Sequence, residues 1–189
     1  GVKNRDWVDI WGGDGFYNKI DPNNPNLVYT ESQGGNSGRV NLATGEALTM
    51  RPNPRPGPDG EVEAYRYNWN APIASSQHNS NTIYVANNHL MRSLDQGLTW
   101  EEASPDLTNN VDRDSLPIMG ELVTDSTLSR HDGQSQYGTI SVVEESPLSA
   151  DIVYVGTDDG NIQVTQDGGA TWTNVAENVD DLPALSYVS

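Results

Sequence analysis

The chain has 189 residues, with 27 acidic and 10 basic side chains, a formal net charge of −17 and no cysteine. Nucleic acid and anionic membranes are bound through clusters of Lys and Arg, so this charge argues against both partners. Without cysteine, disulfides and thiolate metal sites are excluded. No apolar run reaches the ~18 residues of a membrane span, and no signal peptide is present in this sequence.

Short β-branched and aromatic runs, separated by clusters of Gly, Asn, Asp and Pro, predict antiparallel strands. No stretch keeps a 3.6-residue apolar period over the length of a helix. The strands fall into three units, each with four strands and the same succession of turns. In chain order they are Phe16–Ile20, Leu27–Thr30, Arg39–Leu42 and Glu46–Met50, then Pro72–Ser75, Thr82–Ala86, Leu90–Ser93 and Thr99–Ala103, then Thr139–Glu144, Asp151–Gly156, Asn161–Thr165 and Thr171–Val175.

An eight-residue pattern, Ser/Thr-x-Asp-x-Gly-x-Thr-Trp, spans the turn between the third and fourth strands in residues 93–100 and again in residues 165–172. Its glycine suits a turn position with positive φ. Its aspartate can accept backbone N–H bonds across the turn, which favours a structural role over one as acid or ligand. Its tryptophan begins the fourth strand and is expected to pack between sheets. The residues given this structural role are Ser93, Asp95, Gly97, Trp100, Thr165, Asp167, Gly169 and Trp172.

These turns resemble the Asp-box, or BNR repeat, of sialidase-like and sortilin-like β-propellers, over roughly residues 12–180. More narrowly, the chain is similar to bacterial exported BNR-repeat proteins classed as glycosyl hydrolases with sortilin-type propellers. The resemblance implies an all-β fold, a β-propeller segment of about three four-stranded antiparallel blades, and an extracellular or periplasmic location. The first unit departs from the pattern, because Asn41–Glu46 replaces its Asp-box. The stretches that carry the narrower similarity are 12–17, 31–36, 67–72 and 128–133.

A four-stranded blade takes about 40–45 residues, which assigns residues 12–52, 68–106 and 138–178 to three blades. Residues 51–67 and 107–137 are then insertions, and a polar loop as long as the second is more often functional than ornamental. Propellers need about four to eight blades to close a ring. We therefore expect the ends of the chain to belong to neighbouring blades. The remaining blades of a longer chain, or a homo-oligomer, would complete the ring.

Strand direction predicts two ends for the blades, and the polar candidates gather at the end opposite the Asp-boxes. Glycoside hydrolysis usually takes two carboxylates, for which Glu31, Asp158 and Asp159 are the candidates. Asp158 ends a Tyr-x-x-Thr-Asp segment that resembles the catalytic-acid segment of xyloglucan-cleaving propellers. For Asp158 and Asp159 turn structure is favoured, with catalysis and cation binding as alternatives. The ligand-binding candidates are Asp14, Tyr17, Arg39, Trp69, Arg130, His131 and Asp132.

Two classes of function stay open. One is an exported hydrolase that processes glycans through the carboxylates near Glu31 and Asp158. The other is a non-catalytic, sortilin-like module that binds a peptide, a protein or a glycan. The family resemblance favours the hydrolase, whereas Gln33 at the place of a second acid and too few basic residues for a sialidase arginine triad favour the binding module. No cofactor is required by either, and a structural divalent cation such as calcium stays open.

Overall fold

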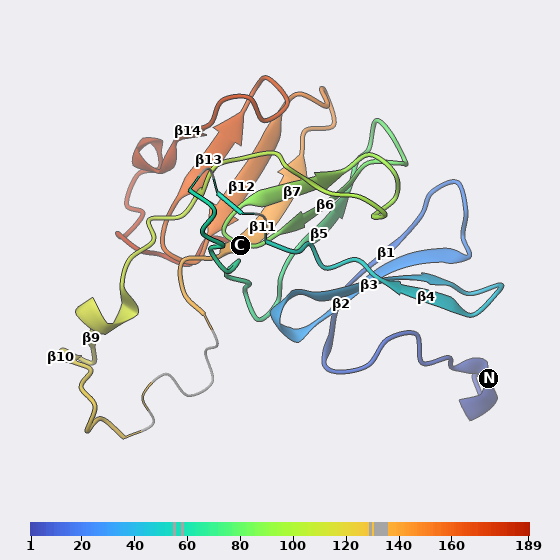
Figure 1. The fold of residues 1–189 in the computed structure, drawn as a ribbon, viewed down its shortest axis with the longest axis horizontal. Helices are drawn as coiled ribbons and strands as arrows, with labels where there is room; N and C mark the ends of the chain where they lie inside the picture. Colours follow the sequence, from blue (N-terminus) through green and yellow to red (C-terminus); the bar gives the residue numbers. More distant parts are fainter. Residues whose placement is uncertain (55, 58, 129, 131–135) are drawn as a thin grey trace.

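The computed structural model describes residues 1–54, 56–57, 59–128, 130 and 136–189. In this part of the chain the backbone forms three four-stranded antiparallel sheets and one two-stranded hairpin, and the helical turns are short 3-10 segments. The strands of each four-stranded sheet lie in chain order. Figure 1 shows the three sheets as an open array that does not close into a ring. The prediction of an all-β propeller segment with three four-stranded blades is confirmed.

The blades follow one another along the chain, and their first strands lie innermost, with β5 (Ile73–Ser75) in contact with both β1 (Gly15–Ile20) and β11 (Ile140–Glu145). The fourth strands of blades 2 and 3, β8 (Glu101–Glu102) and β14 (Thr173–Asn174), are shorter than predicted, because pairing begins only after the tryptophan that ends each repeated turn. Blade 1 has strands β1 (Gly15–Ile20), β2 (Leu27–Ser32), β3 (Asn36–Asn41) and β4 (Glu46–Thr49); blade 2 has β5 (Ile73–Ser75), β6 (Ile83–Ala86), β7 (Leu90–Ser93) and β8 (Glu101–Glu102); blade 3 has β11 (Ile140–Glu145), β12 (Val153–Thr157), β13 (Ile162–Thr165) and β14 (Thr173–Asn174).

Blade 2 lies between the other two blades, and both of its faces are therefore buried by apolar packing. Successive side chains of a strand point to opposite faces, and β6 is buried along its whole length. Ile83 and Val85 pack in a cluster with Tyr29 of blade 1. Tyr84 and Ala86, which alternate with them, pack in a second cluster with residues of blade 3. The two cores between blades therefore come from the alternating pattern of a single strand.

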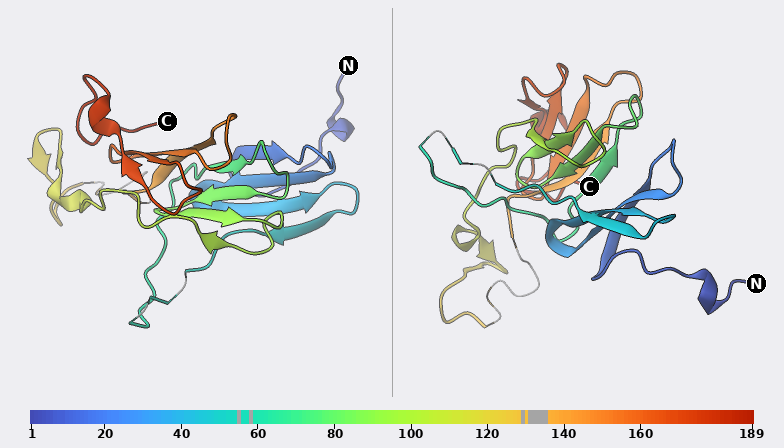
Figure 2. Two further views of the ribbon diagram at one scale, coloured as in Figure 1. Left: turned by 90° about the horizontal axis from the view of Figure 1, so that it is seen from above. Right: turned by 45° about the vertical axis from the view of Figure 1, so that its right-hand side comes forward.

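The insertion at residues 107–137 has more structure than the polar loop that the sequence predicts. It contains the 3-10 turn η3 (Arg113–Ser115) and a hairpin of β9 (Pro117–Ile118) and β10 (Glu121–Leu122). The hairpin projects away from the sheets (Figures 1 and 2). Three further 3-10 turns are η1 (Asn4–Asp6), η2 (Gln33–Gly35) and η4 (Ala176–Asn178). Over the described ranges, no helix has both the length and the apolar character needed to cross a bilayer.

Candidate functional site

The connections between strands lie at two ends of the blades. We call the end with the β1–β2 and β3–β4 turns, and their counterparts in blades 2 and 3, the turn face; the other end, with the β2–β3, β6–β7 and β12–β13 loops, is the loop face. On the turn face, Gln96 donates from Nε2 to Oδ2 of Asp21 at 3.1 Å, and Asn23 donates to the hydroxyl of Ser80 at 2.6 Å. The repeated turns thus contact a neighbouring blade on the turn face. The carboxylates at the ends of β2 and β12 belong to the loop face.

In the first repeated turn, the carboxylate of Asp95 is occupied by the turn itself. Its Oδ1 accepts from the Ser93 hydroxyl at 2.7 Å and from the N–H groups of Leu98 and Thr99 at 3.1 and 2.8 Å. Its Oδ2 accepts from the Thr99 hydroxyl at 2.6 Å. The bonds from Thr99, with the others, hold the pKa of Asp95 at about 2. Asp167 is bound in the same way in the second turn. Both carboxylates therefore act within their own turns.

Asp158 and Asp159 are 3% and 0% exposed at the loop that follows β12. Asp158 accepts from the N–H and the hydroxyl of Thr139 at 2.8 and 2.7 Å. Asp159 accepts from the Thr157 hydroxyl at 2.6 Å and the Asn109 N–H at 2.8 Å. Burial, with a smaller part from the charge of Asp159, raises the pKa of Asp158 despite the donors of Thr139. Asp158 therefore fixes the entry to β11, and Asp159 fixes the start of the long insertion.

Glu31 differs from these aspartates because one of its oxygens has no donor. The residue is 1% exposed; Oε1 accepts from the Gly35 N–H at 3.1 Å, and Oε2 has no hydrogen-bond partner. Burial raises the pKa of Glu31 to about 8, although the N–H of Gly35 opposes this effect. At neutral pH the side chain is mostly a neutral acid. A carboxylic acid kept protonated by burial is the form in which Glu acts as a general acid.

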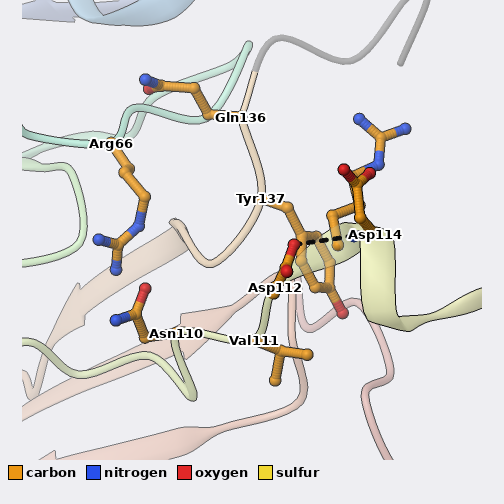
Figure 3. Close-up of a pocket in the computed structure, with 8 residues that line it drawn as sticks. Arg66, Asn110, Val111, Asp112, Asp114, Gln136 and Tyr137 are labelled. Atoms are coloured by element: carbon orange, nitrogen blue, oxygen red, sulfur yellow. Dashed lines mark hydrogen bonds between the residues drawn. The ribbon is translucent and has the colours of Figure 1, made fainter. Parts of the chain in front are cut away.

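A pocket of about 430 Å³ forms where the two insertions meet. We call it the insertion pocket. In Figure 3, Arg66 and Asn110 lie on one side of it and Tyr137 lies beside Asp112 on the other. Asp112 accepts from the backbone N–H of Asp114 at 3.0 Å, which caps η3. The lining residues are Arg66 from the first insertion and Asn110, Val111, Asp112, Arg113, Asp114, Gln136 and Tyr137 from the second.

Partly buried polar contacts hold Arg66 at the insertion pocket. Arg66 donates from Nη2 to Asp106 at 2.6 Å and to the Thr108 hydroxyl at 3.1 Å, so its charge is paired and its side chain is held. Burial raises the pKa of Tyr137, and the charge of Asp159 adds to this shift. Asp159 accepts from the N–H of Asn109, which precedes the lining residue Asn110, so this aspartate fixes the segment from which the pocket lining begins.

Three of the predicted ligand residues gather near Glu31. The N–H of Asp14 donates to the side-chain oxygen of Gln33 at 2.7 Å, and the carbonyl of Trp69 accepts from the N–H that follows Gln33 at 2.9 Å. Burial and the charge of Glu31 raise the pKa of Tyr17. Asp14, Tyr17 and Trp69 thus surround the end of β2, separate from the insertion pocket.

The other predicted ligand residues lie elsewhere. Arg39 donates from Nη1 to the carbonyl of Gln96 at 3.4 Å, so its guanidinium is directed to a repeated turn on the turn face. Arg130 pairs with Asp114, which lines the insertion pocket, and with Asp125. His131 and Asp132 lie outside the described residues. No group of three or more His, Asp or Glu side chains is placed to hold a metal ion within the described ranges.

Sequence reasoning missed the insertion-pocket residues Arg66, Asn110, Gln136 and Tyr137. They come from two insertions separated by blade 2, and no short motif links them. The sequence carries a partial signal, because its pattern puts both insertions outside the blades and the length of the second indicates a functional loop. Tyr137 and Arg66 also lie one and two residues before the predicted starts of blades 3 and 2, where the chain returns to the sheets.

No protein-family model and no curated protein matches the chain. Among solved structures, the GH74 xyloglucanase from Xanthomonas campestris is 19% identical, with a TM-score of 0.51 over 87% of this chain and 21% of that one. A GH74 enzyme from Niastella koreensis is 16% identical, with a TM-score of 0.47 over 86% of this chain and 22% of that one. The chain spans about a fifth of the length of these proteins. The similarity to the xyloglucanase shows a shared β-propeller fold.

Proposed function

We propose that this chain is the ligand-binding part of a glycan-processing β-propeller and that the insertion pocket binds a neutral carbohydrate. The lining carries the proposal, since it combines an aromatic ring, amides, carboxylates and guanidinium groups around one polar hollow. Sugar hydroxyls take hydrogen bonds from such groups, and the C–H faces of the ring pack on aromatic side chains. The net charge of −17 disfavours acidic glycans, which a surface of this sign repels.

Calorimetric titration with neutral and acidic oligosaccharides tests the binding site. Replacing Tyr137 by Ala is expected to weaken binding of a neutral oligosaccharide about tenfold or more, or about 1.4 kcal/mol. Tyr154→Ala is the matched control, because Tyr154 is an exposed tyrosine of blade 3 outside the pocket. Equal losses in both variants, or none in Tyr137→Ala, would place the ligand elsewhere.

A second candidate function, glycoside hydrolysis, is supported by the state of Glu31. Its raised pKa and unpartnered Oε2 are those of a group that holds a proton near neutral pH. A substrate screen on the wild-type chain tests for turnover, with Asp158→Asn and Asp159→Asn as positioning controls. If Glu31 donates the proton, Glu31→Gln abolishes turnover and keeps carbohydrate binding. Turnover that survives Glu31→Gln excludes Glu31 as the acid, and binding without turnover on every substrate favours the non-catalytic module.

We also assign the two repeated turns to the Asp-box class and place the protein outside the cytoplasm, on the resemblance described above. The carboxylate of Asp95, bound by a hydroxyl before it and a threonine after it, supports the first assignment. A sortilin-like peptide ligand is the alternative to carbohydrate, and a peptide library screened against the same Tyr137→Ala variant separates the two. Light scattering and cell fractionation test the proposed completion of the ring and the extracellular or periplasmic location.

A further inference from the structure

The outer side of blade 3 has the same backbone arrangement as the side of blade 2 that packs against blade 3. After the fourth strand of blade 2, the N–H of Ala103 donates to the carbonyl of Leu90 at 2.8 Å. After the fourth strand of blade 3, the N–H of Val175 donates to the carbonyl of Ile162 at 2.7 Å. Val175 is therefore the counterpart of Ala103.

Ala103 receives the repeated turn of the next blade. The indole Nε1 of Trp172 donates to its carbonyl at 3.1 Å. Gly169 lies flat against the same carbonyl, since a Cβ at Gly169 would come within 2.5 Å of the oxygen. Nearby, Arg92 of blade 2 donates to the carbonyl of Gly168 at 2.8 Å. This surface of blade 2 thus accepts a glycine and a tryptophan spaced as in the repeat. In the described part of the chain, no repeated turn lies on Val175.

A tyrosine at the second position of the second strand is covered in blade 2 and exposed in blade 3. In blade 2 this residue is Tyr84, which is 3% exposed and donates its hydroxyl to Glu145 of blade 3 at 3.1 Å. In blade 3 it is Tyr154, which is 48% exposed. The side chain is the same and only the neighbouring blade differs. Tyr154 therefore has the position of an interface residue without its covering blade.

Val188 already makes one backbone contact that a next blade would make with blade 3. The N–H of Ile140, which begins β11, donates to the carbonyl of Asn87 at 2.8 Å. The N–H of Val188 donates to the carbonyl of Thr157 at 3.0 Å. Asn87 and Thr157 each lie three residues after the tyrosine just compared. Val188 is thus bound to blade 3 as Ile140 is bound to blade 2.

We propose that the outer face of blade 3 is a docking surface for a fourth blade of the same repeat type, continuous with the interface between blades 2 and 3. This blade brings a Gly-x-Thr-Trp turn onto Val175 and a carboxylate onto the hydroxyl of Tyr154. A second copy docking through blade 1 does not supply these contacts, because Asn41–Glu46 replaces the turn there and contains no tryptophan. The proposal is independent of carbohydrate binding, since its contacts lie outside the insertion pocket.

The test extends the full chain by one blade. Because Val188 corresponds to Ile140, a copy of residues 142–178 is appended directly after Ser189. Docking is expected to raise the melting temperature by about 5 °C or more and to slow amide exchange in β12 at least about tenfold. A control with one additional residue at the junction turns every side chain of the new inner strand to the wrong face. Equal stabilisation in the control, or an extended chain that is insoluble or no more stable, would overturn the proposal.

The melting temperatures of two matched variants, Tyr154→Ala and Tyr84→Ala, test the docking at single residues. In the 189-residue chain, Tyr154→Ala is expected to change the melting temperature little and Tyr84→Ala to lower it strongly. In the extended chain both substitutions are expected to lower it, because Tyr154 then becomes buried as Tyr84 is. A Tyr154→Ala effect that is the same in both chains would show that no blade covers this face.

Discussion

Replacing Glu31 by Gln is expected to stabilise the protein at alkaline pH and to change its stability little near pH 4.5. Burial raises the pKa of Glu31 from 4.5 to about 8 in the folded state. Between these values the folded chain holds a proton that the unfolded chain releases, so the free energy of unfolding falls as pH rises through this interval. Below pH 4.5 both states are protonated, and the stability associated with the neutral acid is fully present.

The size of the effect follows from the same interval. At 1.36 kcal/mol per pH unit, the interval between 4.5 and about 8 corresponds to at most about 5 kcal/mol. Relaxation and water penetration lower such values, so we expect about 2–3 kcal/mol. Gln keeps an oxygen for the Gly35 N–H and cannot ionise, so the variant avoids this loss.

Urea denaturation of the wild type and of Glu31→Gln at pH 5, 7 and 8.5 measures the difference. The stability advantage of the variant should grow with pH and level off above about pH 8. Glu145→Gln is the control, because both oxygens of this buried glutamate already have donors in Ser76, Gln77 and Tyr84. That variant is expected to lose stability instead. A difference between the wild type and Glu31→Gln that stays constant from pH 5 to 8.5 would refute the reasoning.

Four further predictions concern the repeated turns and the pocket. Asp95→Ala is expected to lower the free energy of unfolding by about 1–2 kcal/mol, because water replaces part of its bonds in a partly exposed turn, while carbohydrate affinity in calorimetry stays unchanged. Since the folded pKa of Asp95 is about 2, its contribution to the free energy of unfolding is present above about pH 4 and is lost as pH falls towards 2. Acid unfolding followed by circular dichroism should therefore depend less steeply on pH in Asp95→Asn than in the wild type. Trp172→Ala should cost about 2–4 kcal/mol in urea denaturation, and Trp172→Phe less, since it loses mainly the bond to the Ala103 carbonyl. Asp159 does not line the pocket, but it accepts from the N–H of Asn109. Asp159→Ala should therefore speed amide exchange in residues 107–113 and weaken carbohydrate binding.

Agreement between sequence and structure is closest for the strands of the blades. Alternating apolar residues and tight turns are local features, and β6 shows how one short run builds two cores. The repeated turn was also readable, because the hydroxyl, aspartate and threonine that bind one another lie within seven residues, from Ser93 to Thr99. Strand ends were less exact: β3 begins at Asn36, three residues before the predicted start, because Glu31 and Ser32 pair with Ser37 and Asn36 across the loop.

The candidate site was predictable only in part. The sequence indicated the loop face and the importance of Asp158 and Asp159, but it did not show that their oxygens are occupied by Thr139, Thr157 and Asn109. Arg39 was expected on the loop face, and its guanidinium instead contacts a turn at the other end of the neighbouring blade. Long polar side chains reach beyond their own strand end, so strand direction alone does not locate their charged groups.

What the sequence by itself determined is the repeated blade: its strand order, its turns and the residues that stabilise them, all of which follow from contacts between residues close in the chain. Only the tertiary structure decided where ligand chemistry can occur. It brought Arg66 and Tyr137 to one pocket across 71 residues of sequence, and it left one oxygen of Glu31 without a donor while satisfying its aspartate counterparts. Burial and hydrogen-bond satisfaction depend on which segments pack together, and no local pattern encodes that choice.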